Sequence, residues 1–341
     1  MSDAGDHPGG SGATTGVGTQ ALPATAVAHP SLNARDRTPL IMRPAAEGTK
    51  PIASLRGRLR VWHQDAAVFA SNRVALGALV FLVLIVLFCF AGPIFYKSNQ
   101  VAATLLNSNL APSSQFPLGT DPEGFDILGR LMVGGQSTLE VGFFVAVLST
   151  AFGALFGALA GYLGGVVDSI LMRIVDTMLS IPFLFFAVLV ATLLQPTLPL
   201  IIVAITVVSW PSTARIVRSE TLSIKTRDYV TAATGFGSWH LRLVGRHVLP
   251  NSIGSIIVNA TLKVATAILL FASLAFLGLG VPPPATSWGK MVTLGIGHLN
   301  TGYWWQLWLP AVAIVLTVMA VSLVGDGLYD VVVKRQGAAK A

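Results

Sequence analysis

The stretch Val74-Ala-Leu-Gly-Ala-Leu-Val-Phe-Leu-Val-Leu-Ile-Val-Leu-Phe-Cys-Phe-Ala-Gly92 contains no charged residue and is followed by Pro93. A helix that crosses the hydrocarbon core of a bilayer needs about 20 mainly apolar residues. Proline cannot donate a backbone hydrogen bond, so it often ends a helix. The stretch therefore predicts a transmembrane helix that ends at Pro93.

Five more apolar stretches follow at intervals that suit short connections. They are Thr138–Leu163, Leu171–Leu194, Leu198 to about Ala214, about Ile253–Val281, and Leu307–Val324 with an extension to Val333 left open. Two prolines between the third and fourth stretches suit a tight turn. The pattern predicts an all-α integral membrane protein with six transmembrane helices.

Composition independently excludes an ordinary soluble protein. The 341 residues are 53% apolar and 11% charged, whereas a soluble domain carries about 25% charged residues. The net charge of +7 would suit a nucleic-acid partner in a soluble chain, but a membrane protein acquires such an excess from its cytoplasmic loops. We therefore expect membrane lipid and no nucleic acid as a partner. The single cysteine, Cys89, excludes an intrachain disulfide or a cysteine-based metal cluster.

The distribution of Lys and Arg predicts the topology. Eighteen lie on one side: in the segment before the first stretch, in the fourth-to-fifth connection, in the C-terminal tail, and, as Arg173, at the start of the third stretch. The connections on the other side hold three. Basic residues concentrate in cytoplasmic loops. An even number of spans places both termini on one side, so we expect the N- and C-termini to be cytoplasmic.

Four regions are expected along the chain. Residues 1–50 are rich in Gly, Ser, Ala, Thr and Pro and predict a disordered tail. Residues 51–73 form a basic, partly amphipathic segment typical of a membrane surface. Residues 74–333 form the six-helix domain, and residues 334–341 a cytoplasmic tail.

Four glycines recur every fourth residue in and after the second stretch. Small residues at this spacing let two helices approach closely. The spacing predicts a helix-packing seam, with Gly157→Ala milder than Gly157→Leu. The four are Gly153, Gly157, Gly161 and Gly165.

Four ionisable side chains near or within the apolar stretches, Asp176, Lys263, Asp326 and Asp330, are candidates for function, because charge inside a membrane is costly. Asp176 follows Arg173 by three residues, which places the two on one helix face near the cytoplasmic end, where water or a partner can satisfy them. Lys263 lies two to three turns inside the fifth stretch, where it could reach the interface or line a cavity. Structural or interfacial roles are favoured, because no ladder of acids resembles a proton relay.

Motifs of catalysis are absent from the sequence. It contains no GxxxxGK[ST], HExxH or GxSxG pattern, and its six histidines have no ligand spacing. We therefore expect a protein that is not an enzyme, binds no metal and does not itself hydrolyse ATP.

The connection between the fourth and fifth stretches, about residues 226–250, is patterned rather than random. Thr226 or Asp228 can begin a short helix and Gly235 or Gly237 can end it. Such a helix would offer a small surface suited to a groove in a partner protein. The predicted docking residues are Asp228, Tyr229, Thr231, Ala232, Ala233, Phe236 and Gly237.

This connection resembles the EAA loop of bacterial ABC importer permeases, through Asp228-Tyr-Val-Thr-Ala-Ala-Thr-Gly-Phe-Gly237 and Arg246-His-Val-Leu-Pro-Asn251. Further blocks resemble the C-type subunit of the dipeptide/oligopeptide permease family. They are 116–126, 164–168, 172–176, 181–182, 273–283, 287–289 and 325–328. Thr231 stands at the family's glutamate position, and Tyr329-Asp-Val-Val-Val replaces its usual Arg-Asp-Ala-Leu-Asp-Pro ending.

The resemblance implies a type I ABC importer permease fold in a bacterial inner membrane, and a subunit that lines half of a peptide pathway. It also implies a homologous B-type permease partner, two ATPase subunits that bind ATP and Mg, and an extracytoplasmic solute-binding protein. The docking residues above would then pass nucleotide-driven closure to the helices. This chain itself would bind no cofactor.

Three other interpretations stay open. A nickel or other small-solute permease shares these motifs. A stand-alone secondary transporter would need an internal repeat or broken helices around an ion site, and no repeat is visible. A membrane-embedded enzyme would need a catalytic constellation, and the sequence contains none.

Overall fold

The computed structural model describes residues 66–227 and 244–338, and in these ranges every regular element is a helix. The long helices are α2 (Arg73–Phe95), α3 (Ile127–Leu163), α4 (Gly165–Ser180), α5 (Phe183–Leu193), α6 (Leu198–Lys225), α9 (Leu249–Phe276), α10 (Trp288–Ile296) and α11 (Trp304–Ala338). Short helical turns are η1 (Leu105–Asn107), η2 (Val244–Val248) and η3 (Leu299–Thr301). Five helices (α2, α3, α6, α9 and α11) are long and apolar enough to cross a membrane.

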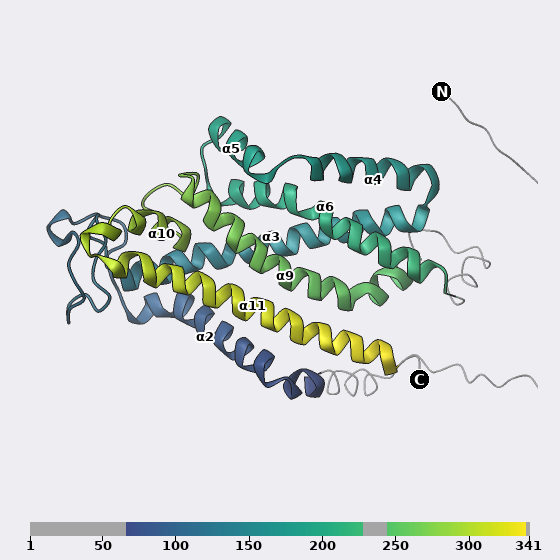
Figure 1. The fold of residues 1–341 in the computed structure, drawn as a ribbon, viewed down its shortest axis with the longest axis horizontal. Coiled ribbons are helices and arrows are strands. Elements are labelled where there is room, and N and C mark those ends of the chain that lie inside the picture. The colour runs from purple at the N-terminus through teal and green to yellow at the C-terminus, as the bar shows by residue number, and fades with distance from the viewer. Residues whose placement is uncertain (1–65, 228–243, 339–341) are drawn as a thin grey trace, which may run out of the picture. The chain divides into compact units, whose positions relative to one another are not determined.

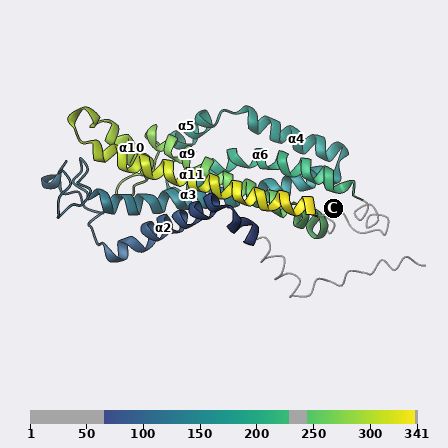
Figure 2. The same cartoon turned by 60° about the horizontal axis from the view of Figure 1, so that its bottom comes forward.

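Helix α3 contacts α2, α4, α6, α9 and α10 and leaves one apolar face exposed. It packs against α6 and α9, while α2 and α11 lie together on one side and α4 and α5 on the opposite side of α6 (Figures 1 and 2). We call the end of the bundle where α6 ends and η2 begins the loop end. The other end, which carries α10 and residues 96–126, is called the α10 end (Figure 1).

Helix α2 extends through Pro93 and does not end there as the sequence predicts. Pro93 has no N–H to donate to the carbonyl of Cys89 four residues earlier. The side-chain amide of Gln136 on α3 donates to that carbonyl instead, at 2.8 Å. A neighbouring helix thus satisfies the group that proline leaves unpaired.

The third apolar stretch is two helices instead of one. Helix α4 ends at Ser180 and α5 begins at Phe183, with Ile181 extended at φ −84° and ψ 116°. Pro182 explains this break, because a residue before proline is pushed out of the helical region. Helix α5 folds over α6 and α9, where its buried Ala187 packs with Ile201 and Leu274.

Other helices extend beyond the apolar stretches that predict them. Helix α3 begins at Ile127, eleven residues before the predicted start, because the side chain of Asp126 accepts a hydrogen bond from Gly129 N at 3.0 Å and caps it. Helix α6 continues beyond Ala214 to Lys225, and α11 extends past Asp326 and Asp330, both exposed. Polar residues mark where the apolar run ends but do not end a helix that still packs on its neighbours.

Candidate functional site

The glycines of α3 form a close seam with α6. A Cβ atom added to Gly153 would lie 2.7 Å from the carbonyl oxygen of Trp210, and one added to Gly161 would lie 2.9 Å from that of Arg218. One added to Gly157 would overlap the carbonyl oxygen of Ala214. The two backbones are therefore in contact over two turns, where dispersion rather than a hydrophobic force holds membrane helices together.

One expectation about this stripe needs correction. Gly165 is not part of the seam, because α3 ends at Leu163 and Gly165 begins α4 with φ +54° and open space around its Cβ position. At Gly157 even the methyl group of alanine would meet backbone atoms of α6. That alanine is milder than leucine there stays a prediction.

Ion pairs join α4 to α6 at the loop end. Arg218 donates two hydrogen bonds to the carboxylate of Asp168, at 2.5 and 2.6 Å, and forms a bidentate contact with it. Arg215 pairs with Asp176 at 2.5 Å, and both side chains are about half exposed. The carboxylate of Asp176 thus pairs across to α6 and not with Arg173, which lies one turn earlier on its own helix.

The predicted docking residues Asp228, Tyr229, Thr231, Ala232, Ala233, Phe236 and Gly237 lie outside the described residues. The chain on either side of them is well anchored. Ile224, before the gap, and Val244 and Val248, after it, are buried in one cluster with Ala158 of the glycine seam. Lys225 also donates to the carbonyl of Tyr162 at the end of α3, at 2.7 Å. A movement of either flank would therefore also displace α3 and α6.

Lys263 lies midway along α9 and faces α6. Its ammonium donates to the carbonyl oxygen of Ser209 at 2.9 Å and to the hydroxyl of Ser212 at 2.5 Å. Four residues earlier on α9, the side chain of Asn259 accepts a hydrogen bond from Thr213 at 2.9 Å. Insertion of a lysine at the centre of a bilayer costs about 2.5–3.5 kcal/mol. The interface between α6 and α9 therefore holds a side chain whose insertion is costly, and both of its hydrogen-bond acceptors are neutral.

A second polar cluster lies at the α10 end. Arg130, which is 4% exposed, contacts the carboxylates of Asp121 at 3.5 Å and Glu123 at 3.2 Å and donates to the carbonyl of Pro284 at 3.0 Å. Its guanidinium also lies 3.7 Å from the centre of the Phe125 ring. Burial raises the pKa of Asp121, and hydrogen bonds from backbone N–H groups together with the charge of Arg130 oppose that change.

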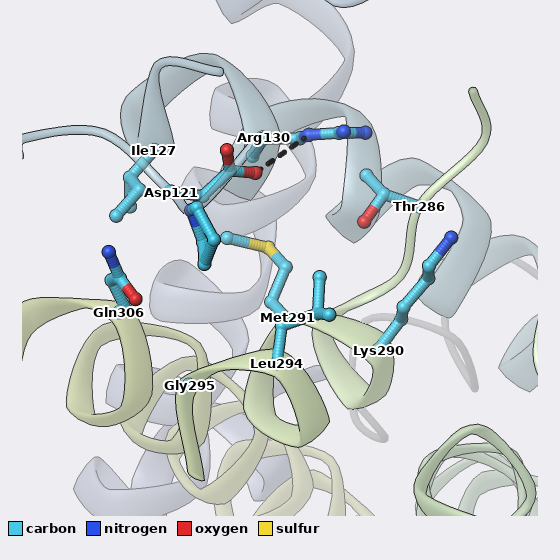
Figure 3. A pocket seen from close by; sticks show the side chains of 10 residues that line it. Asp121, Ile127, Arg130, Thr286, Lys290, Met291, Leu294, Gly295 and Gln306 are labelled. Carbon is cyan, nitrogen blue, oxygen red and sulfur yellow. Dashed lines mark ion pairs between the residues drawn. The ribbon is translucent and has the colours of Figure 1, made fainter. Parts of the chain in front are cut away.

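Figure 3 shows the small pocket beside this ion pair, with Met291 and Lys290 of α10 below it and Gln306 of α11 at its side. Its interior of about 10 Å³ has room for one water molecule. The pocket is therefore too small for a solute. Arg130 instead ties residues 116–126 to the connection between α9 and α10.

Several of these residues were not singled out from the sequence. The sequence indicates Arg130 only as a charge for topology, and no local pattern identifies its buried partners. The blocks 116–126, 273–283 and 287–289 were matched separately, but the structure brings them together at the α10 end. There Trp288, 1% exposed, donates its indole N–H to Leu131 O of α3 at 2.8 Å.

Comparisons with known proteins agree on the kind of protein that this chain resembles. Residues 153–337 match the family described as binding-protein-dependent transport system inner membrane component. Residues 61–112 match the N-terminal transmembrane domain of oligopeptide transport permease C.

Two relatives come from Bacillus subtilis strain 168. The chain is 39% identical over 272 residues to the oligopeptide transport system permease protein OppC, which covers 80% of this chain and 89% of that protein. It is 39% identical over 259 residues to the dipeptide transport system permease protein DppC, covering 76% and 81% respectively.

Among solved structures, the fold resembles a chain of the MetNI methionine ABC transporter in inward-facing conformations. The TM-score is 0.50 at 22% identity, and the match covers 59% of this chain and 96% of that chain. This likeness concerns the fold alone.

Proposed function

The chain belongs to the family of binding-protein-dependent transport system inner membrane components, and we propose that it is the C-type permease subunit of an ATP-driven peptide importer. The observation that carries this proposal is the similarity over most of the chain to oligopeptide and dipeptide permease proteins. The long apolar helices fit a subunit that lines half of a translocation pathway.

In this proposal the chain crosses the membrane six times, with both termini in the cytoplasm. Helices α2, α3, α6, α9 and α11 supply five crossings, and the broken pair α4–α5 supplies the third in order. The eighteen-to-three bias of Lys and Arg supports a cytoplasmic loop end. The α10 end then faces outward.

Residues 228–237 are the proposed docking segment for an ATPase subunit. Support comes from their flanks, because Ile224, Val244 and Val248 share one buried cluster with the seam of α3 and α6. A push on this segment would move two packed helices as a unit. ATP binding would shift the population toward an outward-open pathway, and hydrolysis would reset it.

The proposed assembly contains this chain, a homologous B-type permease, two ATPase subunits and an extracytoplasmic solute-binding protein. ATP and Mg are expected on the ATPase subunits, and no cofactor on this chain. Within residues 66–227 and 244–338, no group of His, Cys, Asp or Glu lies close enough together to hold a metal ion.

Two competing proposals differ from this one in the solute or in the energy source. A nickel or other small-solute permease would use the same fold for another solute. A stand-alone secondary transporter would need no ATPase. The peptide permease names of the relatives favour peptides over both.

Transport by the reconstituted complex tests the function. Vesicles that contain both permeases and both ATPases, supplied with the binding protein, are expected to accumulate radiolabelled di- or oligopeptide only when ATP is present. Uptake of ⁶³Ni²⁺ in parallel tests the small-solute alternative. Uptake that persists without the ATPases would favour a secondary transporter.

A further inference from the structure

Helix α9 carries a stripe of polar side chains along one side. Ser255, Asn259, Lys263, Thr266 and Ser273 follow one another at spacings of four, four, three and seven. At 100° per residue they fall within a sector of about 80°, interrupted by Leu270. Thr266 and Ser273 are exposed, and the other three are half-buried.

This stripe differs from the exposed faces of α2 and α3. Those faces carry large apolar side chains, such as Val80 and Leu84 of α2 and Phe144 and Leu148 of α3. Lipid selects apolar faces, whereas a polar stripe on a spanning helix marks a surface that meets water, a solute or another chain.

Lys263 is the one cation on this stripe and lies near mid-membrane depth. It is about 20 Å along α9 from either helix end, at 1.5 Å per residue. Its two hydrogen-bond acceptors, Ser209 O and Ser212 Oγ, are neutral. An ammonium has three N–H groups, and within the described residues no carboxylate pairs with it.

The neighbours of Lys263 indicate which kind of chemical group its charge can bind. Ala267, one turn from Lys263 toward the α10 end, lies in the buried cluster that α5 covers with Ala187. Lys263 therefore lies next to the region that α5 covers. Its polar neighbours there are Ser212 of α6, which accepts its hydrogen bond, and Asn259, one turn earlier on α9. The site is a fixed positive charge with neutral hydrogen-bonding groups, which is suited to an anion and repels a divalent cation.

We propose that Lys263 is a specificity-determining contact for the carboxylate of the transported peptide, bound midway through the membrane. This inference rests on the proposed peptide-import function and adds a residue and a chemical group to it. The ammonium is held by α6 and offers its remaining N–H to the carboxylate. A solute without that anion gains nothing from the contact.

The test compares two substitutions with two peptides. Lys263→Gln keeps a polar side chain with an NH₂ donor group, one bond shorter than lysine, but removes the charge. Lys263→Arg keeps the charge. The substrates are one radiolabelled peptide with a free C-terminal carboxylate and the same peptide as its C-terminal amide. All variants use one binding protein, so its own preference cancels when the acid-to-amide uptake ratio of a variant is divided by that of the wild type. Thr266→Val, on the same stripe but uncharged, is the matched control.

Lys263→Gln is expected to lower the acid-to-amide ratio about tenfold, as the loss of a charged hydrogen bond would. Lys263→Arg and Thr266→Val are expected to leave the ratio within about threefold. Complex yield should stay near wild type in all three variants, because the charge acts on the solute and not on assembly.

Three results would overturn the inference. An unchanged ratio in Lys263→Gln, or an equal fall in uptake of both peptides, would make Lys263 a packing residue between α6 and α9. A loss of complex yield that Lys263→Arg restores would assign the charge to a partner chain. By contrast, wild-type vesicles that transport no peptide but move another solute would contradict the proposed function, and this inference with it.

Discussion

Gly157 is the position where a single methyl group should matter most. A Cβ atom there would overlap the carbonyl oxygen of Ala214, a backbone atom that cannot rotate away. We expect Gly157→Ala to destabilise the bundle by about 1–3 kcal/mol, the usual cost of overpacking. The measurement is the thermal midpoint of the purified permease complex in detergent.

Gly77 on α2 is the matched control for that substitution, because nothing lies within 4 Å of its Cβ position. Gly77→Ala should be neutral or stabilising by up to about 1 kcal/mol, since alanine favours a helix over glycine. Equal midpoints for the two variants would show that α3 and α6 are not in backbone contact at Gly157.

Arg130 gives a second residue-scale prediction, at the α10 end. Arg130→Gln should cost about 3–5 kcal/mol, because it leaves the buried carboxylate of Asp121 without its cation. Burial already raises the pKa of Asp121, and removal of the guanidinium would raise it further. A group whose folded-state pKa is raised contributes stability below its unfolded pKa of about 3.9 and loses it as pH rises through the folded value.

The deficit of Arg130→Gln relative to wild type should therefore shrink as pH is lowered from 7 toward 5, in thermal midpoints measured side by side. Asp121→Asn in the same chain should restore part of the loss at pH 7, because an amide oxygen can still accept the N–H groups of Glu123 and Phe125. A pH-independent deficit with no rescue would rule out the unpaired carboxylate as its cause.

At the scale of elements, Gln136 and Pro93 form a testable pair between α2 and α3. Gln136→Leu removes the donor to Cys89 O and should cost about 1–3 kcal/mol, the penalty of an unsatisfied buried carbonyl. Pro93→Ala supplies a backbone N–H to the same carbonyl within α2. The double variant should therefore be more stable than Gln136→Leu alone, again by thermal midpoint. A double variant no better than the single one would show that the carbonyl finds another donor.

The sequence predicts where helices form better than where they begin, end or meet. Apolar length identified α2, α3, α6, α9 and α11, because membrane thickness sets that length. It missed the break at Pro182, which depends on the conformation of Ile181, and the early start of α3, which depends on its Asp126 cap. Partners on other helices, such as Arg215 for Asp176, could not be read from spacing, which relates residues on one helix only.

For the whole molecule, the family followed from ordered motifs, while the geometry of the site did not. The blocks at 116–126, 273–283 and 287–289 could be matched to relatives without knowing that they meet around Arg130 and Trp288. Lys263 was visible as an intramembrane charge, but its acceptors on α6 depend on how two distant segments pack. Long-range contacts are set by the fold and not by local pattern.

Topology is the remaining whole-molecule prediction, and engineered cysteines can test it. Ser114, exposed at the α10 end, and Thr226, exposed at the loop end, lie at opposite ends of the bundle. The native Cys89 is buried and should not react with a membrane-impermeant maleimide, so single substitutions suffice. In intact cells whose outer layers admit the reagent, a cysteine at Ser114 should be labelled and one at Thr226 should not.

Permeabilised cells provide the control, because both cysteines should then react. The expectation follows from the excess of Lys and Arg at the loop end, where Arg215, Arg218 and Lys225 lie on α6 alone. Labelling of a cysteine at Thr226 from outside would show that the bundle has the opposite orientation in the membrane. It would place residues 228–237 where no ATPase could reach them, and the proposed coupling of ATP hydrolysis to α3 and α6 would have to be abandoned.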